Sequence, residues 1–244
     1  MGIARATGKV TGIARKILKL KYCGAVIVAA GNASRMGGID KVMAELNAEP
    51  MIVHTVRSFQ NCVAVKEIVI VTRPELLTRV MGLCKGFDKV TAVVSGGKDR
   101  QESVELGLNA LSDKVKLAAI HDGARPLITD AVIDRTVRAA HSYGAAAPAV
   151  PVKDTVKIVQ GGVVQSTPER KNLQAVQTPQ VFDYDMLRGA LKKARQDKAE
   201  ITDDCSAVER MGFSVKIVEG DERNIKVTTP MDLKIAQMLL EERQ

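Results

Sequence analysis

Two hydrophobic periods alternate along most of the chain after Tyr22. Short runs of consecutive apolar residues, many of them β-branched, predict buried strands at residues 24–28, 68–71, 90–94, 117–120, 145–150 and 215–218. Between these runs, apolar residues recur every three or four positions, which predicts helices at 51–59, 74–84, 101–111, 129–143, 184–196, 204–211 and 230–241. Strands and helices in this order form βαβ units. We therefore expect an α/β fold with a Rossmann-like, mostly parallel sheet and helices on both faces.

The alternation breaks after Pro151. Residues 155–159 and 163–165 alternate apolar and polar positions around Gly161-Gly162, a pattern typical of a β-hairpin. An isolated hairpin is too small to be stable alone and has to pack on another surface. We therefore predict a projecting β-hairpin arm at about residues 152–177, within a single domain that spans residues 22–244.

Residues 1–21 form a basic N-terminal extension, because they hold six of the eight net positive charges and no acidic residue. Apolar residues from Val10 to Leu20 fall at helical spacing, so two interpretations stay open: a solvated extension, or a contact with a membrane surface or nucleic acid. The rest of the chain is nearly neutral, which argues against a basic DNA-binding body. Aromatic residues make up 3% and Trp is absent, which argues against stacking on single-stranded nucleic acid. We expect neither nucleic acid nor membrane as a partner.

The cysteines indicate a cytoplasmic protein. Cys23, Cys62, Cys84 and Cys205 show no C-x-x-C spacing, and we interpret them as reduced thiols. No run reaches the roughly 18 apolar residues that span a membrane. Basic residues before residues 23–33 resemble a secretory signal peptide, but cleavage there would remove the first strand.

Glycine-bearing and charged loops follow three of the predicted strands, at residues 29–41, 95–103 and 121–126. In an open parallel sheet, ligands bind beyond the carboxyl ends of the strands, so these loops should surround one crevice. The first loop carries Arg35 and Lys41, and its backbone N–H groups can face an anion. It is neither a Walker A loop nor a G-x-G-x-x-G fingerprint. We predict a phosphate-bearing ligand; the alternative is a surface turn with two solvated cations.

These loops, together with Ala-Val-Gln-Thr-Pro-Gln at 175–180, Thr-Asp-Asp at 202–204 and Asn-Ile-Lys-Val-Thr at 224–228, resemble the 2-C-methyl-D-erythritol 4-phosphate cytidylyltransferases of the non-mevalonate isoprenoid pathway. The resemblance implies a nucleotidyltransferase that moves a cytidylyl group from CTP to 2-C-methyl-D-erythritol 4-phosphate. CDP-methylerythritol and pyrophosphate would form by in-line attack on the α-phosphate, with Mg²⁺ as cofactor. It also implies a homodimer in which the arm completes the partner's site.

The same resemblance assigns residues to roles. The implied catalytic residues are Arg35, Lys41 and Lys226. Those implied to bind the nucleotide are Ala29, Ala30, Gly31, Gly97, Arg100 and Ser103. Asp122 would hold the metal. The implied substrate-binding residues are Arg125, Thr155, Arg170, Thr178, Thr202 and Lys226. The chain departs from the family pattern where Val42 follows Lys41 and where the preceding segment is short and lacks a proline.

Several alternatives stay open. Ribitol 5-phosphate cytidylyltransferases share these loops and differ in the acceptor pocket. A non-catalytic nucleotide-binding regulator could keep the fold, although the presence of Arg35, Lys41, Asp122 and Lys226 argues against it. Arg100 either orders its loop or forms a surface ion pair with Asp99 or Glu102. We interpret His121 as a structural imidazole, because the chemistry needs no histidine.

Overall fold

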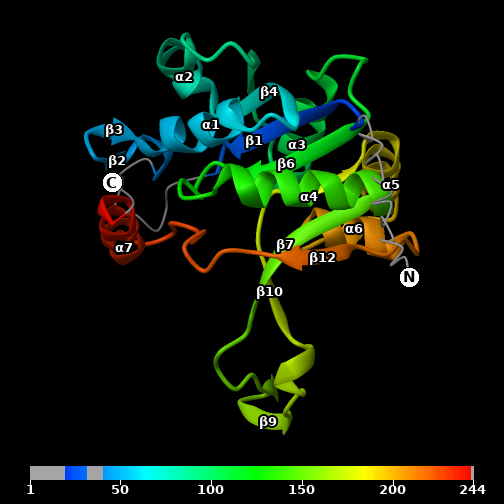
Figure 1. The fold of residues 1–244 in the computed structure, drawn as a ribbon. Coiled ribbons are helices and arrows are strands. Elements are labelled where there is room, and N and C mark those ends of the chain that lie inside the picture. Colours follow the sequence, from blue (N-terminus) through cyan, green and yellow to red (C-terminus); the bar gives the residue numbers. More distant parts are fainter. Residues whose placement is uncertain (1–19, 32–40, 243–244) are drawn as a thin grey trace, which may run out of the picture.

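The computed structural model describes residues 20–31 and 41–242 and centres on an eight-stranded sheet (Figure 1). The strand order is β10-β7-β11-β6-β1-β4-β5, and β12 also pairs with β7. The strands are β1 (Cys23–Ala29), β4 (Val65–Thr72), β5 (Val90–Ser95), β6 (Leu117–Asp122), β7 (Ala145–Pro151), β10 (Gln174–Val176), β11 (Gln180–Asp183) and β12 (Lys216–Glu219). β1 pairs in parallel with β4 and β6, and β4 with β5. β11 runs antiparallel to both β6 and β7. The mostly parallel sheet is thus confirmed. It contains two antiparallel strands, β10 and β11, that the apolar pattern did not reveal.

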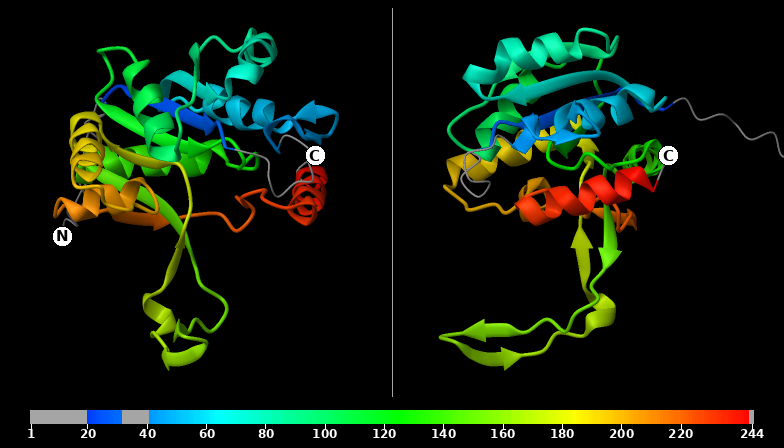
Figure 2. Two further views of the ribbon diagram at one scale, coloured as in Figure 1. Left: turned by 180° about the vertical axis from the view of Figure 1, so that it is seen from behind. Right: turned by 90° about the vertical axis from the view of Figure 1, so that its left-hand side faces the viewer.

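Helices cover both faces of the sheet, as predicted (Figure 2). Two separate cores explain the unbroken apolar runs: Ala25 and Ile27 of β1 enter one core, whereas Val26 enters the other. The first core takes side chains from α1 (Met51–Asn61), α2 (Leu77–Cys84) and α4 (Asp130–Tyr143). The second takes them from α3 (Arg100–Asn109), α5 (Tyr184–Gln196) and α6 (Asp204–Arg210).

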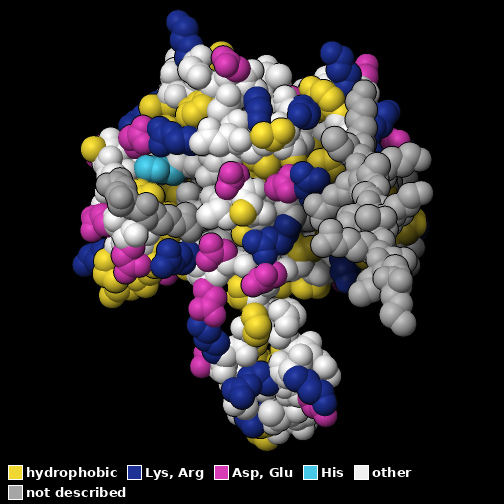
Figure 3. Space-filling model, in the orientation of Figure 1, with side chains coloured by type: hydrophobic (Ala, Val, Ile, Leu, Met, Phe, Trp, Pro, Cys, Tyr) yellow, Lys and Arg dark blue, Asp and Glu magenta, His cyan; other side chains and the backbone are white. Residues whose placement is uncertain are grey.

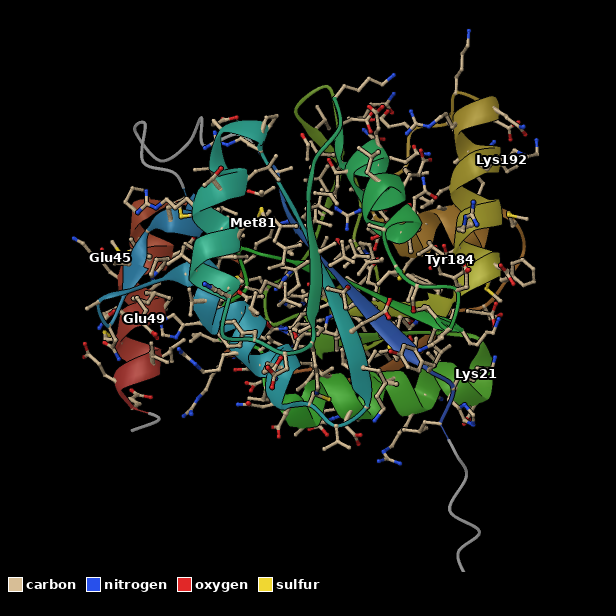
Figure 4. All side chains as sticks on the ribbon, turned by 90° about the horizontal axis from the view of Figure 1, so that it is seen from above. Lys21, Glu45, Glu49, Met81, Tyr184 and Lys192 are labelled. Atoms are coloured by element: carbon tan, nitrogen blue, oxygen red, sulfur yellow. The ribbon has the colours of Figure 1, made fainter. Side chains whose placement is uncertain are left out.

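The last helix, α7 (Pro230–Glu241), packs on a small hairpin of β2 (Glu45–Leu46) and β3 (Glu49–Pro50). Thr229 caps α7 by accepting a hydrogen bond from the Asp232 N–H. Seen from above, Glu45 and Glu49 lie beside α7, at the opposite end of the molecule from Tyr184 and Lys192 on α5 (Figure 4). Met81 projects from α2 and is largely exposed. The described residues also form three short 3₁₀ helices: η1 (Lys41–Met43), η2 (Pro74–Leu76) and η3 (Arg170–Asn172).

The predicted arm is confirmed: the chain leaves the body at β7 and returns through β10 (Figure 1). At its far end, β8 (Ile158–Gln160) pairs antiparallel with β9 (Val163–Ser166). The turn between them uses Gly161 and Gly162 at φ 57° and 79°, a region that favours glycine. Apolar and basic side chains of the arm both reach its surface (Figure 3).

The start of the described chain joins the body. Lys21 Nζ donates a hydrogen bond to Asp183 at 3.0 Å, and Leu20 packs against the first core. Residues 1–19, which make up most of the predicted extension, lie outside the described residues. None of the helices described by the structure has both the length and the apolar content to cross a membrane.

Candidate active site

The carboxyl ends of β1 and β6 and the loop after β5 meet around a cavity of about 280 Å³. The cavity contains all of the residues that the sequence assigned to the nucleotide, together with Asp122 and Lys226. Its lining is Val28, Ala29, Ala30, Gly31, Val42, Gly97, Lys98, Asp99, Arg100, Ser103, Asp122, Ala124 and Lys226. Residues from four separate segments therefore converge on one edge of the sheet, as a parallel sheet requires.

Three cations surround the carboxylate of Asp122, the last residue of β6. Lys226 Nζ lies 2.9 Å from Oδ2, Arg125 Nε lies 3.6 Å from Oδ2, and Arg100 Nε lies 3.9 Å from Oδ1. Burial opposes ionisation of Asp122, but the charges of Lys226, Arg100 and Arg125 outweigh it, so the pKa lies below its usual value. The carboxylate is therefore ionised, and the cations around it form a positively charged rim.

A second, fully buried carboxylate orients Arg100. The two terminal nitrogens of Arg100 donate to Asp204 at 3.1 and 2.7 Å, a bidentate geometry. Burial raises the pKa of Asp204, and the positive charge of Arg100 opposes that rise. Gln180 Oε1 accepts hydrogen bonds from the N–H groups of Asp204 and Cys205, which fixes the start of α6.

This bond to a distant helix was not among the sequence interpretations of Arg100. A surface pair with Asp99 or Glu102 is wrong, because both acids serve the backbone of the loop instead. Asp99 caps α3 by accepting from the Glu102 N–H at 2.7 Å, and Glu102 accepts from the Lys98 N–H at 2.9 Å. Arg100 instead binds Asp204 and lines the cavity.

Beside the cavity, Gly96 lies very close to the side chain of Ala30. A Cβ at position 96 would lie 2.3 Å from the Ala30 Cβ, so only glycine fits between the first loop and the loop after β5. The Gly97 N–H donates to Ser103 Oγ at 3.1 Å, and that hydroxyl donates to the Asp99 carbonyl at 2.8 Å. In this part of the cavity, backbone N–H and C=O groups and the Ser103 hydroxyl could form hydrogen bonds with a flat polar ring.

His121 lies behind this cavity and is fully buried. Its Nε2 is 3.3 Å from the Arg125 carbonyl, so Nε2 carries the proton and donates. The Thr178 hydroxyl lies 2.9 Å from Nδ1 and donates to it, while Thr178 Oγ1 accepts from the Asp122 N–H at 3.1 Å. Burial lowers the pKa of His121 to about 4, so the ring is neutral. These contacts fit the structural role expected of His121.

The acceptor residues implied by the resemblance divide into two groups. Arg125 and Lys226 contact Asp122, and Thr178 lies buried directly behind it. Thr202 is exposed ahead of α6 and does not line the cavity. Thr155 and Arg170 lie exposed on the arm, where Arg170 donates to the Lys153 carbonyl at 2.9 Å. Arg35 and the side chain of Lys41 lie outside what the structure describes, although Lys41 begins η1.

The residues that sequence reasoning missed form long-range contacts. Asp204, Gln177 and Asn224 all lie inside motifs that carried the resemblance, yet no local pattern shows which side chains they meet. Lys98, Asp99 and Ala124 line the cavity because they follow strands whose ends were already candidates. The position of a residue in a loop after a strand could therefore predict that it lines the cavity. Nothing in the sequence could predict the partners of Asp204, Gln177 and Asn224.

Known proteins resemble this chain over most of its length. The family model described as 2-C-methyl-D-erythritol 4-phosphate cytidylyltransferase matches residues 23–242. A relative of that name from Desulforamulus reducens is 46% identical over 225 residues, which cover 90% of this chain and 96% of the relative. One from Caldanaerobacter subterraneus subsp. tengcongensis is 42% identical, with 88% and 97% covered.

Solved structures extend the likeness to the fold. The 4-diphosphocytidyl-2C-methyl-D-erythritol synthase from Anaerococcus prevotii superimposes with a TM-score of 0.83 at 29% identity, covering 91% of this chain and 96% of that one. The 2-C-methyl-D-erythritol 4-phosphate cytidylyltransferase from Thermus thermophilus gives 0.74 at 30% identity, with 88% and 98% covered. The chain belongs to the 2-C-methyl-D-erythritol 4-phosphate cytidylyltransferase family.

Proposed function

We propose that this chain transfers the cytidylyl group of CTP to 2-C-methyl-D-erythritol 4-phosphate, forming CDP-methylerythritol and pyrophosphate. Family membership supports the reaction, and relatives that are 42–46% identical carry that name. The structural observation that carries the proposal is the ring of Lys226, Arg125 and Arg100 around Asp122 at the glycine-lined cavity. Two phosphate-bearing substrates meet in such a reaction, and clustered cations are what they require.

The reaction needs no covalent enzyme intermediate. An oxygen of the acceptor phosphate attacks the α-phosphorus of CTP, and the bond from that phosphorus to the pyrophosphate oxygen breaks. Catalysis then depends on positioning and on charge neutralisation. We assign Lys226 and Arg125 to the acceptor phosphate. We assign Arg35 and Lys41 to the charge that develops on the α-phosphate and on the leaving pyrophosphate.

The donor set fits Mg²⁺ in the form that nucleotide enzymes use. Among the residues that the structure describes, no group of three or more His, Cys, Asp or Glu side chains could hold a metal ion. Mg²⁺ usually takes one or two carboxylates and completes its shell with water and substrate phosphates. The buried, ionised Asp122 could supply one such ligand. When bound, the ion would neutralise charge on the triphosphate.

The base would lie on the other side of the cavity, over the close contact between Gly96 and Ala30. Backbone groups of Ala29, Ala30 and Gly97 and the Ser103 hydroxyl line that side. Cytosine offers an exocyclic amino donor and ring acceptors, which such groups can pair. Arg100, held by Asp204, would stand between the base and the phosphates.

We further propose a homodimer in which the arm completes the partner's acceptor site. The arm exposes a set of apolar side chains, namely Val156, Ile158, Val159, Val163, Val164 and Val176. Such a surface on so thin an element favours packing against another chain. Thr155 and Arg170 belong to this arm, which projects from the body (Figure 1), and neither lines the cavity of its own chain.

Mixed dimers test the shared site. Arg170→Ala removes the arm's contribution and Lys226→Ala removes the body's, so each variant alone should turn over poorly. A co-expressed mixture would contain dimers in which one site holds both mutations and the other holds neither. Activity well above that of either variant supports the proposal, whereas activity equal to their average refutes a shared site. The Arg170→Ala dimer should also show weaker acceptor binding and unchanged CTP binding.

We place the reaction in the cytoplasm. All four cysteines are free and buried, which suits a reducing compartment. Burial raises the pKa of Cys84 to about 11, so this thiol stays protonated and unreactive.

The alternative acceptor is ribitol 5-phosphate, and an activity assay can distinguish the two. Pyrophosphate release from CTP and Mg²⁺ should be measured in parallel with each of the two acceptors and with neither. We expect release with methylerythritol phosphate and not with ribitol 5-phosphate. Release with ribitol 5-phosphate alone would refute the proposed acceptor, and CTP binding without release would support a regulator.

A further inference from the structure

Two buried amide side chains join the return strand of the arm to the segment that carries Lys226. Gln177, which directly follows β10, is 6% exposed, and Asn224 is fully buried. Gln177 Nε2 donates to the Asp221 carbonyl at 2.8 Å, and Gln177 Oε1 accepts from the Asp221 N–H at 3.3 Å. Asn224 Nδ2 donates to the same Oε1 at 3.3 Å. We refer to these two residues as the amide pair.

The orientation of the amide pair is unambiguous. Asn224 Nδ2 also donates to the Thr178 carbonyl at 3.0 Å, so both of its partners are oxygens and the amide cannot be reversed. Gly220 lies against the pair, because a Cβ there would be 2.6 Å from Gln177 Oε1 and 2.9 Å from the Ala149 carbonyl oxygen. The segment after β12 is therefore held closely along the base of the arm.

The residues of the amide pair and their neighbours contact the side chains of the acceptor side of the cavity. The backbone carbonyl of Asn224 accepts from Arg125 Nη1 at 2.7 Å. Two residues later, Lys226 Nζ reaches Asp122 at 2.9 Å. On the other side, Thr178, next to Gln177, accepts from the Asp122 N–H. The three side chains assigned to metal and acceptor are thus all supported from the amide pair and its neighbour.

We infer that Gln177 and Asn224 are positioning residues, which hold Arg125 and Lys226 at the distances from Asp122 that acceptor binding needs. The amide pair also connects the base of the arm to the acceptor side of the cavity, because β10 ends one residue before Gln177. The nucleotide side has a separate support, the bond of Arg100 to Asp204. The inference rests on the proposed function only in naming the ligand of these cations as the acceptor phosphate.

The first test separates acceptor from nucleotide. In Asn224→Ala and Gln177→Ala, we expect KM for the acceptor to rise roughly tenfold, the scale of losing an outer partner of a binding group, while KM for CTP stays unchanged. Because both residues act through one network, the double variant should cost little more than the worse single variant. Glu67→Gln is the matched control, since Glu67 is a buried acceptor of three hydrogen bonds from Tyr22 and Ser112, in β4 near the start of β1. It should lower Tm and leave both KM values unchanged.

A second readout needs no activity. Trace labelling of lysine amines, followed by peptide mass spectrometry, should show Lys226 reacting several-fold faster in the Ala variants than in the wild type, with exposed Lys66 unchanged as internal reference. If the wild type turns over and the variants show neither an acceptor KM shift nor faster Lys226 labelling, the inference is refuted. If the wild type does not turn over, the proposed function fails and the labelling alone decides the positioning role. Equal shifts in both KM values with unchanged labelling would indicate a structural defect and would also refute the inference.

Discussion

Mild acid should destabilise this protein through His121. The ring is fully buried, and burial lowers its pKa from 6.5 to about 4. Between these values the unfolded chain binds a proton that the folded chain excludes, so stability falls as pH falls. From pH 7.5 to pH 5 this single group should lower the free energy of unfolding by about 2 kcal/mol. The loss is complete below the folded pKa.

Urea unfolding at a series of pH values measures this effect. Other groups titrate in the same range of conditions, so the informative quantity is the difference between wild type and His121→Gln. Glutamine can still donate to the Arg125 carbonyl and accept from Thr178, but it does not titrate. The variant should lose most of the slope between pH 6.5 and pH 5. Equal slopes in the two proteins would refute a buried neutral His121.

The remaining predictions concern the reaction. Arg35→Ala or Lys41→Ala should lower kcat by roughly 10²–10³, the scale of losing one electrostatic stabiliser, with the thermal unfolding midpoint unchanged; normal turnover in initial-rate assays would contradict the assigned roles. Asp122→Asn should weaken the dependence of rate on Mg²⁺, and a Mg²⁺ titration equal to that of the wild type would show that the carboxylate does not hold the ion. Asp204→Asn removes the charged partner of Arg100 and should raise KM for CTP roughly tenfold or more, with KM for the acceptor unchanged. A change in the acceptor KM alone would contradict the account of Arg100.

The pattern of apolar residues predicted the strands that are buried on both faces of the sheet. β1 and β6 are buried on both faces, so their apolar runs are continuous and their ends, at Ala29 and Asp122, could be located. β10 and β11 escaped notice because they have three and four residues and include glutamines. The burial of β11 and the pairing of both strands depend on β6 and β7, which lie earlier in the chain.

The site divides in the same way. Loops at the ends of parallel strands must converge, so the lining of the cavity could be predicted from topology. Partners of the functional side chains could not: Arg100 and Asp204 are 104 residues apart, and Gln177 and Asn224 are 47 apart. The two residues of each pair lie close together only because the folded sheet brings their elements side by side. A charged residue near Arg100 in sequence, such as Asp99, was therefore the wrong candidate for its partner.

The most direct test of the account is to follow the phosphorus atoms during the reaction. ³¹P NMR of the wild-type protein with CTP, Mg²⁺ and 2-C-methyl-D-erythritol 4-phosphate should show loss of the acceptor's phosphomonoester signal. Pyrophosphate and the two coupled signals of a diphosphate diester should appear in equal amounts, and CTP should stay intact without acceptor. An unchanged acceptor signal, or CTP breaking down to CDP and inorganic phosphate, would contradict cytidylyl transfer by this chain.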